Sequence, residues 1–192
     1  EAALYGSQVA ALFNQVQLAE TGADFSCTSL GNDPVGLSSP VTMRGVTAAY
    51  LFANTLVVLE VTGEVLRQTL ERCAAYFTLV DGQPQISQEF LLPKVEHYNY
   101  DFYAGLAYTF DLRRPVGSRV VRLTKLDGSP LGGGTFRLCT SNYRVTGTGG
   151  YEILRKCPVL WRGGVEMPDL TTRYIQTHSP MPQLHNVEMR VI

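Results

Sequence analysis

A strand covered on both faces that runs directly into an amphipathic helix limits most strongly what this chain can fold into. Residues 55–61 (T-L-V-V-L-E-V) are a largely β-branched and apolar run, which predicts a strand buried on both faces. Residues 62–64 then open a segment whose apolar side chains recur at helical spacing. These side chains are Leu66, Leu70, Cys73, Ala74 and Phe77. We therefore expect an interior strand followed at once by a packed helix.

The rest of the chain mixes helices and strands without regular alternation. Apolar spacing predicts helices over residues 3–18, 42–50 and 169–177, and strands over residues 25–30, 106–112, 120–126, 136–140 and 187–192. The Asp127-Gly128 pair predicts a hairpin turn that returns the chain into the strand at 136–140. The polar stretch 81–89 predicts an exposed loop. We expect one α+β domain over residues 1–192, with a mixed β-sheet packed by helices.

The composition argues against several classes of protein. With 192 residues, 45% of them hydrophobic and 17% charged, the chain suits a single globular domain. A formal net charge of -1 favours neither a nucleic acid nor an acidic membrane surface as partner. Apolar runs fall well short of the roughly 20 residues that a membrane span requires. The chain begins inside a helix-like pattern at Glu1, so we expect it to be part of a longer protein.

The residues that usually carry catalysis or bind metal are scattered. His97, His178 and His185 lie far apart, and no H-E-x-x-H, G-x-S-x-G or P-loop motif occurs. None of the four cysteines falls in a C-x-x-C spacing, which favours buried free thiols over a zinc cluster. A general base at His97 stays open beside the commoner role of a hydrogen-bonded structural histidine. We expect no metal site or cofactor in this chain.

An aromatic residue beside a glycine-rich loop is the segment that most suggests a ligand. Tyr143 is followed by three glycines in four residues, at Gly147, Gly149 and Gly150. Glycine permits positive φ and close approach by a ligand, and a second ring from another loop would clamp a nucleobase for about 1–3 kcal/mol per base. The alternative is a tight turn between a strand and a helix.

Five segments in order resemble the C-terminal domain of the 5′-nucleotidase family. Residues 52–63 (F-A-N-T-L-V-V-L-E-V-T-G) are similar to its F-G-N-T-L…V-x-G segment, and residues 100–111 fit Y-D-F-x-x-G-x-x-Y-x-x-D. Residues 127–131 (D-G-S-P-L) look like its D-G-x-P-[LI] hairpin. Residues 142–150 resemble its final ligand loop, and residues 21–24 fit the entry to its first strand.

The resemblance implies a division of labour between two domains. In that family an N-terminal metallophosphatase domain holds two divalent metals, of the manganese, zinc, magnesium or cobalt type. The C-terminal domain binds the nucleotide and sandwiches its base between two aromatic rings. Carried over to this chain, the implied substrate-binding residues are Phe52 and Tyr143 as the stacking pair, with Asn54, Asn142, Arg144, Gly147, Gly149 and Gly150 around them.

Two departures from the 5′-nucleotidase pattern point to a sister branch. The first loop, at residues 29–34 (S-L-G-N-D-P), lacks the arginine of N-G-G-x-I-R, and Gly149 stands where an aspartate would hold the ribose. Both changes look like the 2′,3′-cyclic-nucleotide 2′-phosphodiesterase/3′-nucleotidases. A phosphate on the 2′ or 3′ oxygen would be repelled by an aspartate at that position, so its loss makes electrostatic sense.

The resemblance thus implies the nucleotide-binding C-terminal domain of a bacterial hydrolase that acts on nucleotide phosphoesters. The domain would bind base and sugar and orient the phosphoester toward the metals of the N-terminal domain, and it would be inactive alone. The intact enzyme would work outside the cytoplasm, in an extracellular, cell-wall or periplasmic location. The alternatives are a 5′-nucleotidase substrate domain, a non-catalytic nucleoside-binding module, and a self-contained hydrolase that uses His97.

Overall fold

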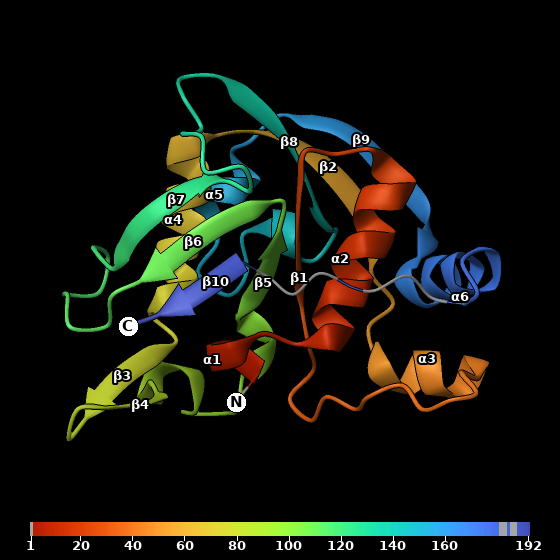
Figure 1. The fold of residues 1–192 in the computed structure, drawn as a ribbon, viewed down its shortest axis with the longest axis horizontal. Helices are drawn as coiled ribbons and strands as arrows, with labels where there is room; N and C mark the ends of the chain where they lie inside the picture. Colours follow the sequence, from red (N-terminus) through yellow and green to blue (C-terminus); the bar gives the residue numbers. More distant parts are fainter. Residues whose placement is uncertain (1, 181–183, 185–187) are drawn as a thin grey trace.

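The computed structural model describes residues 2–180, 184 and 188–192. Its strands form a five-stranded sheet, a three-stranded sheet and a two-stranded hairpin, with helices packed around them (Figure 1). Within the five-stranded sheet, both parallel and antiparallel neighbours occur. The predicted α+β class with a mixed sheet is confirmed.

The five-stranded sheet brings together strands from both halves of the chain. In spatial order they are β5 (Asp101–Ala104), β1 (Phe25–Ser29), β8 (Thr135–Ser141), β2 (Thr55–Thr62) and β9 (Val159–Glu166). β1 and β8 are parallel, and the other neighbours are antiparallel. Although β8 comes late in the sequence, it pairs along its whole length with β2.

The predicted strand–helix pair is present. Residues 56–59 of β2 are buried, as expected for a strand covered on both faces. Thr62 caps helix α4 (Gly63–Ala74), because its hydroxyl accepts a hydrogen bond from a backbone amide of the first turn. The predicted extension of the helical pattern to Phe77 is wrong, because α4 ends at Ala74 and Phe77 begins strand β3 (Phe77–Val80). Its side chain nevertheless joins the core, so its burial followed the pattern although its conformation did not.

The helix predicted over residues 3–18 is two helices. Gly6 has a φ of +84°, which takes the backbone out of the helical conformation after α1 (Ala2–Tyr5). The hydroxyl of Ser7 then caps α2 (Gln8–Thr21). Two buried polar side chains of α2, Asn14 and Gln17, donate hydrogen bonds to carbonyls of β5 and β1. These bonds fix α2 across one side of the five-stranded sheet (Figure 1).

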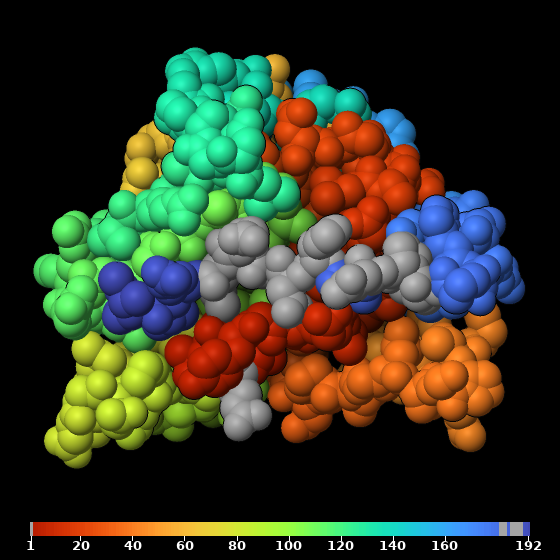
Figure 2. Space-filling view, in the orientation of Figure 1, coloured from red at the N-terminus to blue at the C-terminus, as the bar shows by residue number. Residues whose placement is uncertain are grey.

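The other helices are short. α3 (Met43–Ala49) is capped by Thr42 and α6 (Met167–Thr177) covers the predicted C-terminal helix. α6 meets α2 on the face shown in Figure 2, where the two helices are blue and red. The remaining turns of helix are η1 (Gln88–Phe90), η2 (His97–Asn99), η3 (Arg144–Thr146) and α5 (Glu152–Arg155). Among the described helices, none is long and apolar enough to cross a membrane.

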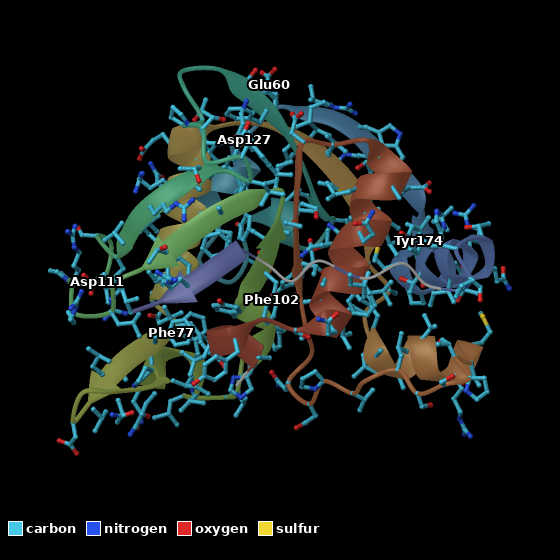
Figure 3. All side chains as sticks on the ribbon, in the orientation of Figure 1. Glu60, Phe77, Phe102, Asp111, Asp127 and Tyr174 are labelled. Carbon is cyan, nitrogen blue, oxygen red and sulfur yellow. The ribbon has the colours of Figure 1, made fainter. Side chains whose placement is uncertain are left out.

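The hairpin predicted around Asp127 and Gly128 is wrong, because the strands before and after it do not pair with each other. β7 (Val120–Lys125) pairs with β6 (Leu106–Phe110), not with β8. The turn itself is present, as the hydrogen bond from the Gly128 amide to the Lys125 carbonyl at 3.0 Å shows. Asp127, which belongs to this turn, is labelled in Figure 3. The glycine-rich residues 131–134 then carry the chain across to the other sheet, where β8 inserts between β1 and β2.

The edges of the sheets hold strands that the sequence did not predict. The predicted exposed loop 81–89 contains β4 (Gln83–Ile86), which pairs with β3, and a buried Phe90 in η1 follows it. β5 and β9 were missed because neither shows alternating polarity, and β9 contains two glycines. Both form because an uncovered sheet edge offers unpaired backbone groups. Of the predicted strand 187–192, residue 187 lies outside the described residues and β10 (Glu188–Val191) pairs with β6.

The cysteines match the expected chemistry. Cys27, Cys73 and Cys139 are buried free thiols, and Cys157 is half-buried and also free. Burial raises the pKa of Cys73 to about 12 and that of Cys139 to about 11. These thiols therefore stay protonated at neutral pH and serve as small core side chains.

We predict that Gly105→Ala destabilises the fold more than Gly117→Ala does. Both glycines have positive φ, at +87° and +88°, so both variants carry the same backbone strain. A Cβ at Gly105, where β5 passes into β6, would lie 2.6 Å from the Asp24 carbonyl oxygen, whereas Gly117 has open space. The extra overpacking cost at Gly105 should be about 1–3 kcal/mol in urea unfolding. Equal losses in both variants would contradict this packing role.

Candidate functional site

The antiparallel pairing of β2 with β8 places two distant loops side by side. Leu56 at the start of β2 pairs with Ser141 at the end of β8. One residue further on, the Asn142 amide donates to the Thr55 carbonyl at 2.9 Å, and the Asn142 side-chain oxygen accepts from the Thr55 amide at 3.1 Å. The segment before β2 and the loop after β8 therefore leave the sheet at the same end.

A cavity of about 440 Å³ opens where these two loops meet. Its lining residues come from the end of β1, the segment before β2, η2 with the stretch before it, and the loop after β8. They are Ser29, Phe52, Asn54, Lys94, Tyr98 and Tyr143. The two rings predicted to stack thus line one cavity. Phe52 and Tyr143 are both half-buried, so each remains accessible in part from the cavity.

Phe52 is held between two other aromatic rings. It stands edge-on to Tyr50, with ring centroids 6.0 Å apart, and edge-on to Tyr98 at 6.2 Å. Tyr50 is buried, and its hydroxyl accepts a hydrogen bond from the Asn54 amide at 3.4 Å. Burial raises the pKa of Tyr50 to about 12, so it stays neutral. The orientation of Phe52 is therefore set by packing and not by the chain direction alone.

Arg144 lies in the interior and not on the cavity wall. Its guanidinium forms an ion pair with Asp101 at 2.7 Å, and each side chain is only 2% exposed. The same guanidinium donates to the carbonyls of Tyr98 at 2.9 Å and Thr148 at 3.2 Å, and it lies 4.1 Å above the Tyr151 ring. Burial by itself would lower the pKa of Arg144, but Asp101 raises it above its ordinary value. The guanidinium of Arg144 is therefore paired and hydrogen-bonded in the interior of the protein.

The three glycines of the loop pack closely against other parts of the protein. Gly147, Gly149 and Gly150 all have positive φ. A Cβ at Gly149 would collide with the Asn99 side chain and lie 2.9 Å from the Arg144 guanidinium, and one at Gly150 would lie 2.8 Å from the guanidinium carbon of Arg72. The geometry is that of a tight turn between a strand and a helix. A ligand role for Arg144 and these glycines stays a prediction.

Comparison with known proteins gives this domain a family. The profile described as 5′-nucleotidase, C-terminal domain, matches residues 3–156. The chain belongs to this family. The resemblance expected from five sequence segments is confirmed, and the 5′-nucleotidase C-terminal fold accounts for its irregular mixture of helices and strands.

Individual relatives agree with the family. A 2′,3′-cyclic-nucleotide 2′-phosphodiesterase/3′-nucleotidase of Haemophilus influenzae is 32% identical over 160 residues, which cover 71% of this chain and 24% of that protein. The trifunctional nucleotide phosphoesterase protein YfkN of Bacillus subtilis is 27% identical over 157 residues, covering 75% of this chain and 10% of that protein. The chain therefore spans a quarter or less of the length of these two relatives.

Solved structures share the fold over nearly the whole chain. A crystal structure of a Staphylococcus aureus protein described as a 5′-nucleotidase, in complex with alpha-ketoglutarate, has a TM-score of 0.94 and 33% identity. It matches 99% of this chain, which corresponds to 37% of that protein. A 5′-nucleotidase precursor of Thermus thermophilus has a TM-score of 0.80 at 22% identity over 100% of this chain and 36% of that one, and it shows the likeness of the fold alone.

The two described histidines of this 5′-nucleotidase C-terminal domain, His97 and His178, lie in different parts of the structure. The His97 ring nitrogen Nδ1 lies 2.8 Å from the Tyr76 hydroxyl, beside a separate cavity of about 330 Å³ lined in part by α1 and β4. His178 stacks on Tyr174 at the end of α6, at 4.1 Å between ring centroids. His185 lies outside the described residues. Within the described residues, no group of three or more His, Cys, Asp or Glu side chains is placed to hold a metal ion.

Sequence reasoning missed three residues that line the cavity. Tyr98 stands in a segment rich in aromatic residues, which is as typical of a core as of a binding site, and only the fold shows that Tyr98 lines the cavity. Ser29 was visible as part of a predicted strand. Lys94 gave no signal, because an isolated lysine next to a proline is common in surface loops.

We predict that Arg144→Met lowers the free energy of unfolding by about 3–5 kcal/mol, because Asp101 would remain buried without its partner. The matched control is Arg113→Met, which breaks the ion pair with Asp111. Since the Arg113 side chain is 71% exposed, water and salt screen this pair, and that change should cost far less than Arg144→Met. Urea unfolding followed by circular dichroism measures both. A small loss in both variants would show that the buried pair does not stabilise the domain.

Proposed function

We propose that this domain binds the base and sugar of a nucleotide and presents the phosphoester to a metal-dependent phosphatase domain of the same polypeptide. The observation that carries the proposal is the cavity in which Phe52 and Tyr143, from two adjacent loops, both expose part of a ring. Its volume of about 440 Å³ lies within the range of small-molecule sites. The names of the relatives, which describe enzymes of nucleotides, point the same way.

Stacking supplies most of the binding in this proposal. The faces of Phe52 and Tyr143 hold the base, and stacking accepts any base because every base has a π-face. Asn54 and Ser29 are the uncharged aliphatic polar side chains of the cavity, and they suit the hydroxyls of the sugar or the edge of the base. Asn142, Arg144 and the three loop glycines keep the Tyr143 loop in place from within the protein.

The chemistry of hydrolysis belongs to another part of the polypeptide. The donor set of the described residues does not fit a two-metal centre, since no cluster of His, Cys, Asp or Glu is present among them. Divalent metals bound in an N-terminal domain would supply Lewis-acid activation and an activated water. This chain contributes orientation, which is worth on the order of 7–11 kcal/mol of the barrier at best, when the reacting groups are well aligned.

The substrate class follows from two features of the loops. The first loop, residues 29–34, has no arginine to hold a 5′-phosphate, and Gly149 leaves no carboxylate beside the sugar. Both favour a 2′,3′-cyclic nucleotide or a 3′-nucleotide, in agreement with the name of the Haemophilus influenzae relative. We assign the intact enzyme to the 2′,3′-cyclic-nucleotide 2′-phosphodiesterase/3′-nucleotidase type, acting outside the cytoplasm.

A 5′-nucleotidase substrate domain is the second candidate. It is favoured by the Staphylococcus aureus protein described as a 5′-nucleotidase, which is 33% identical and has the same fold. The two candidates differ in the nucleotide that binds more tightly. Titration of the domain with adenosine 3′-monophosphate and adenosine 5′-monophosphate decides between them.

We predict that Phe52→Ala and Tyr143→Ala each weaken adenosine binding by about 1–3 kcal/mol, because each removes one stacking face. Isothermal titration calorimetry measures the affinity. Phe52→Tyr and Tyr143→Phe keep a flat ring and should bind adenosine nearly as well as the original chain. If both alanine variants bind normally and only their melting temperatures fall, the two rings are core residues and not a binding site.

The isolated chain should not hydrolyse nucleotides. Incubated with 2′,3′-cyclic AMP and manganese, it is expected to release no more product than a buffer blank, because its described residues offer no metal cluster. Product separation by chromatography gives the measurement. Turnover well above the blank that is abolished by His97→Ala would instead establish a self-contained hydrolase.

A further inference from the structure

The candidate cavity has one charged residue on its wall. Among the described residues that line it, Lys94 alone carries a charge, and the others are aromatic or neutral polar side chains. The Lys94 side chain is 70% exposed, so its ammonium stands at the mouth of the cavity and not beneath it. A nucleotide held by its base against Phe52 and Tyr143 would bring its phosphate to this mouth or beyond it.

The neighbouring arginines cannot take the same role. Arg144 is committed to Asp101 in the interior. Arg72 donates to the Gly149 carbonyl at 2.7 Å and forms an ion pair with Glu89 at 2.6 Å. Both guanidinium groups therefore stabilise the protein around the loop. Among the described residues, the cationic group that remains accessible on the cavity wall is the ammonium of Lys94.

Glu96 holds Lys94 and Tyr98 in one network. One Glu96 carboxylate oxygen lies 3.2 Å from the Lys94 ammonium and accepts from the Tyr98 hydroxyl at 3.2 Å. The other oxygen accepts from the Asn99 amide at 2.8 Å. Hydrogen bonds with Tyr98 and Glu96 raise the pKa of Lys94, and the hydrogen bond from Lys94 lowers the pKa of Glu96. Both groups are therefore charged at neutral pH.

An ammonium group has three donors, so Lys94 keeps a donor for an anion while it bonds its neighbours. We propose that Lys94 binds the phosphate of the nucleotide in this cavity and thereby selects phosphorylated nucleotides over free nucleosides. The inference rests on the proposed function, because it takes the base to be bound by Phe52 and Tyr143. Glu96 partly offsets the positive charge, so the selection is moderate and depends on salt.

The test compares adenosine with adenosine 3′-monophosphate on the purified chain and on Lys94→Gln. In low salt, Lys94→Gln should lower the affinity for adenosine 3′-monophosphate about five- to tenfold, because one charge-assisted hydrogen bond is lost. Its affinity for adenosine should be unchanged. In about 0.5 M sodium chloride the difference between the original chain and the variant should shrink, since the charge interaction is screened.

Two controls separate charge recognition from packing. Lys94→Arg keeps the cation and should retain most of the preference for the phosphorylated ligand. Lys125→Gln removes a lysine from the three-stranded sheet, outside the cavity, and should change neither affinity. Equal weakening of both ligands by Lys94→Gln would overturn the inference, as would an unchanged preference. If the original chain binds neither ligand, the proposed function itself fails; tight adenosine binding without a phosphate preference sinks only the role of Lys94.

Discussion

The buried ion pair between Arg144 and Asp101 is the contact on which the candidate site depends. Removing two charges from water costs several kcal/mol per ion, and their attraction offsets this only where the remaining donors are also satisfied. Arg144 meets that condition by donating to the carbonyls of Tyr98 and Thr148, whereas the second carboxylate oxygen of Asp101 has no hydrogen-bond partner among the described residues. One carbonyl belongs to the segment that lines the cavity and the other to the glycine loop. Satisfying one charge in the interior therefore fixes the two walls of the cavity relative to each other.

The site is built in two layers with different chemistry. The inner layer holds the buried charges and the tightest packing, where a Cβ on Gly149 or Gly150 would collide with an arginine. The outer layer is aromatic and partly exposed, with Lys94 at its mouth. An outer layer of this kind suits a flat ligand that binds by its faces. Arg144 and the loop glycines follow Tyr143 in the sequence but do not line the cavity. Their place in the inner layer explains why they are there.

Local patterns predicted the elements whose formation depends on neighbours in the sequence. Thr42 and Thr62 cap the helices that their positions indicated, and residues 56–59 are buried as their composition required. Predictions failed where a distant partner decided the outcome. β9 is a strand because the edge of β2 needs a partner, although its own sequence, with two glycines, favours no strand. β8 does not pair with β7, its predicted hairpin partner. It lies between β1 and β2, where both of its edges are paired.

The sequence by itself determined the strand and helix around Thr62, the mixed α+β class, and the five segments that mark the 5′-nucleotidase C-terminal domain. Those features are local, because they follow from spacing, capping and residue type. Only the tertiary structure decided that the Phe52 and Tyr143 loops leave one end of the sheet together, that Arg144 points inward, and that Tyr98 and Lys94 complete the cavity. These depend on strand register and on burial, which are set by contacts between residues far apart in the chain.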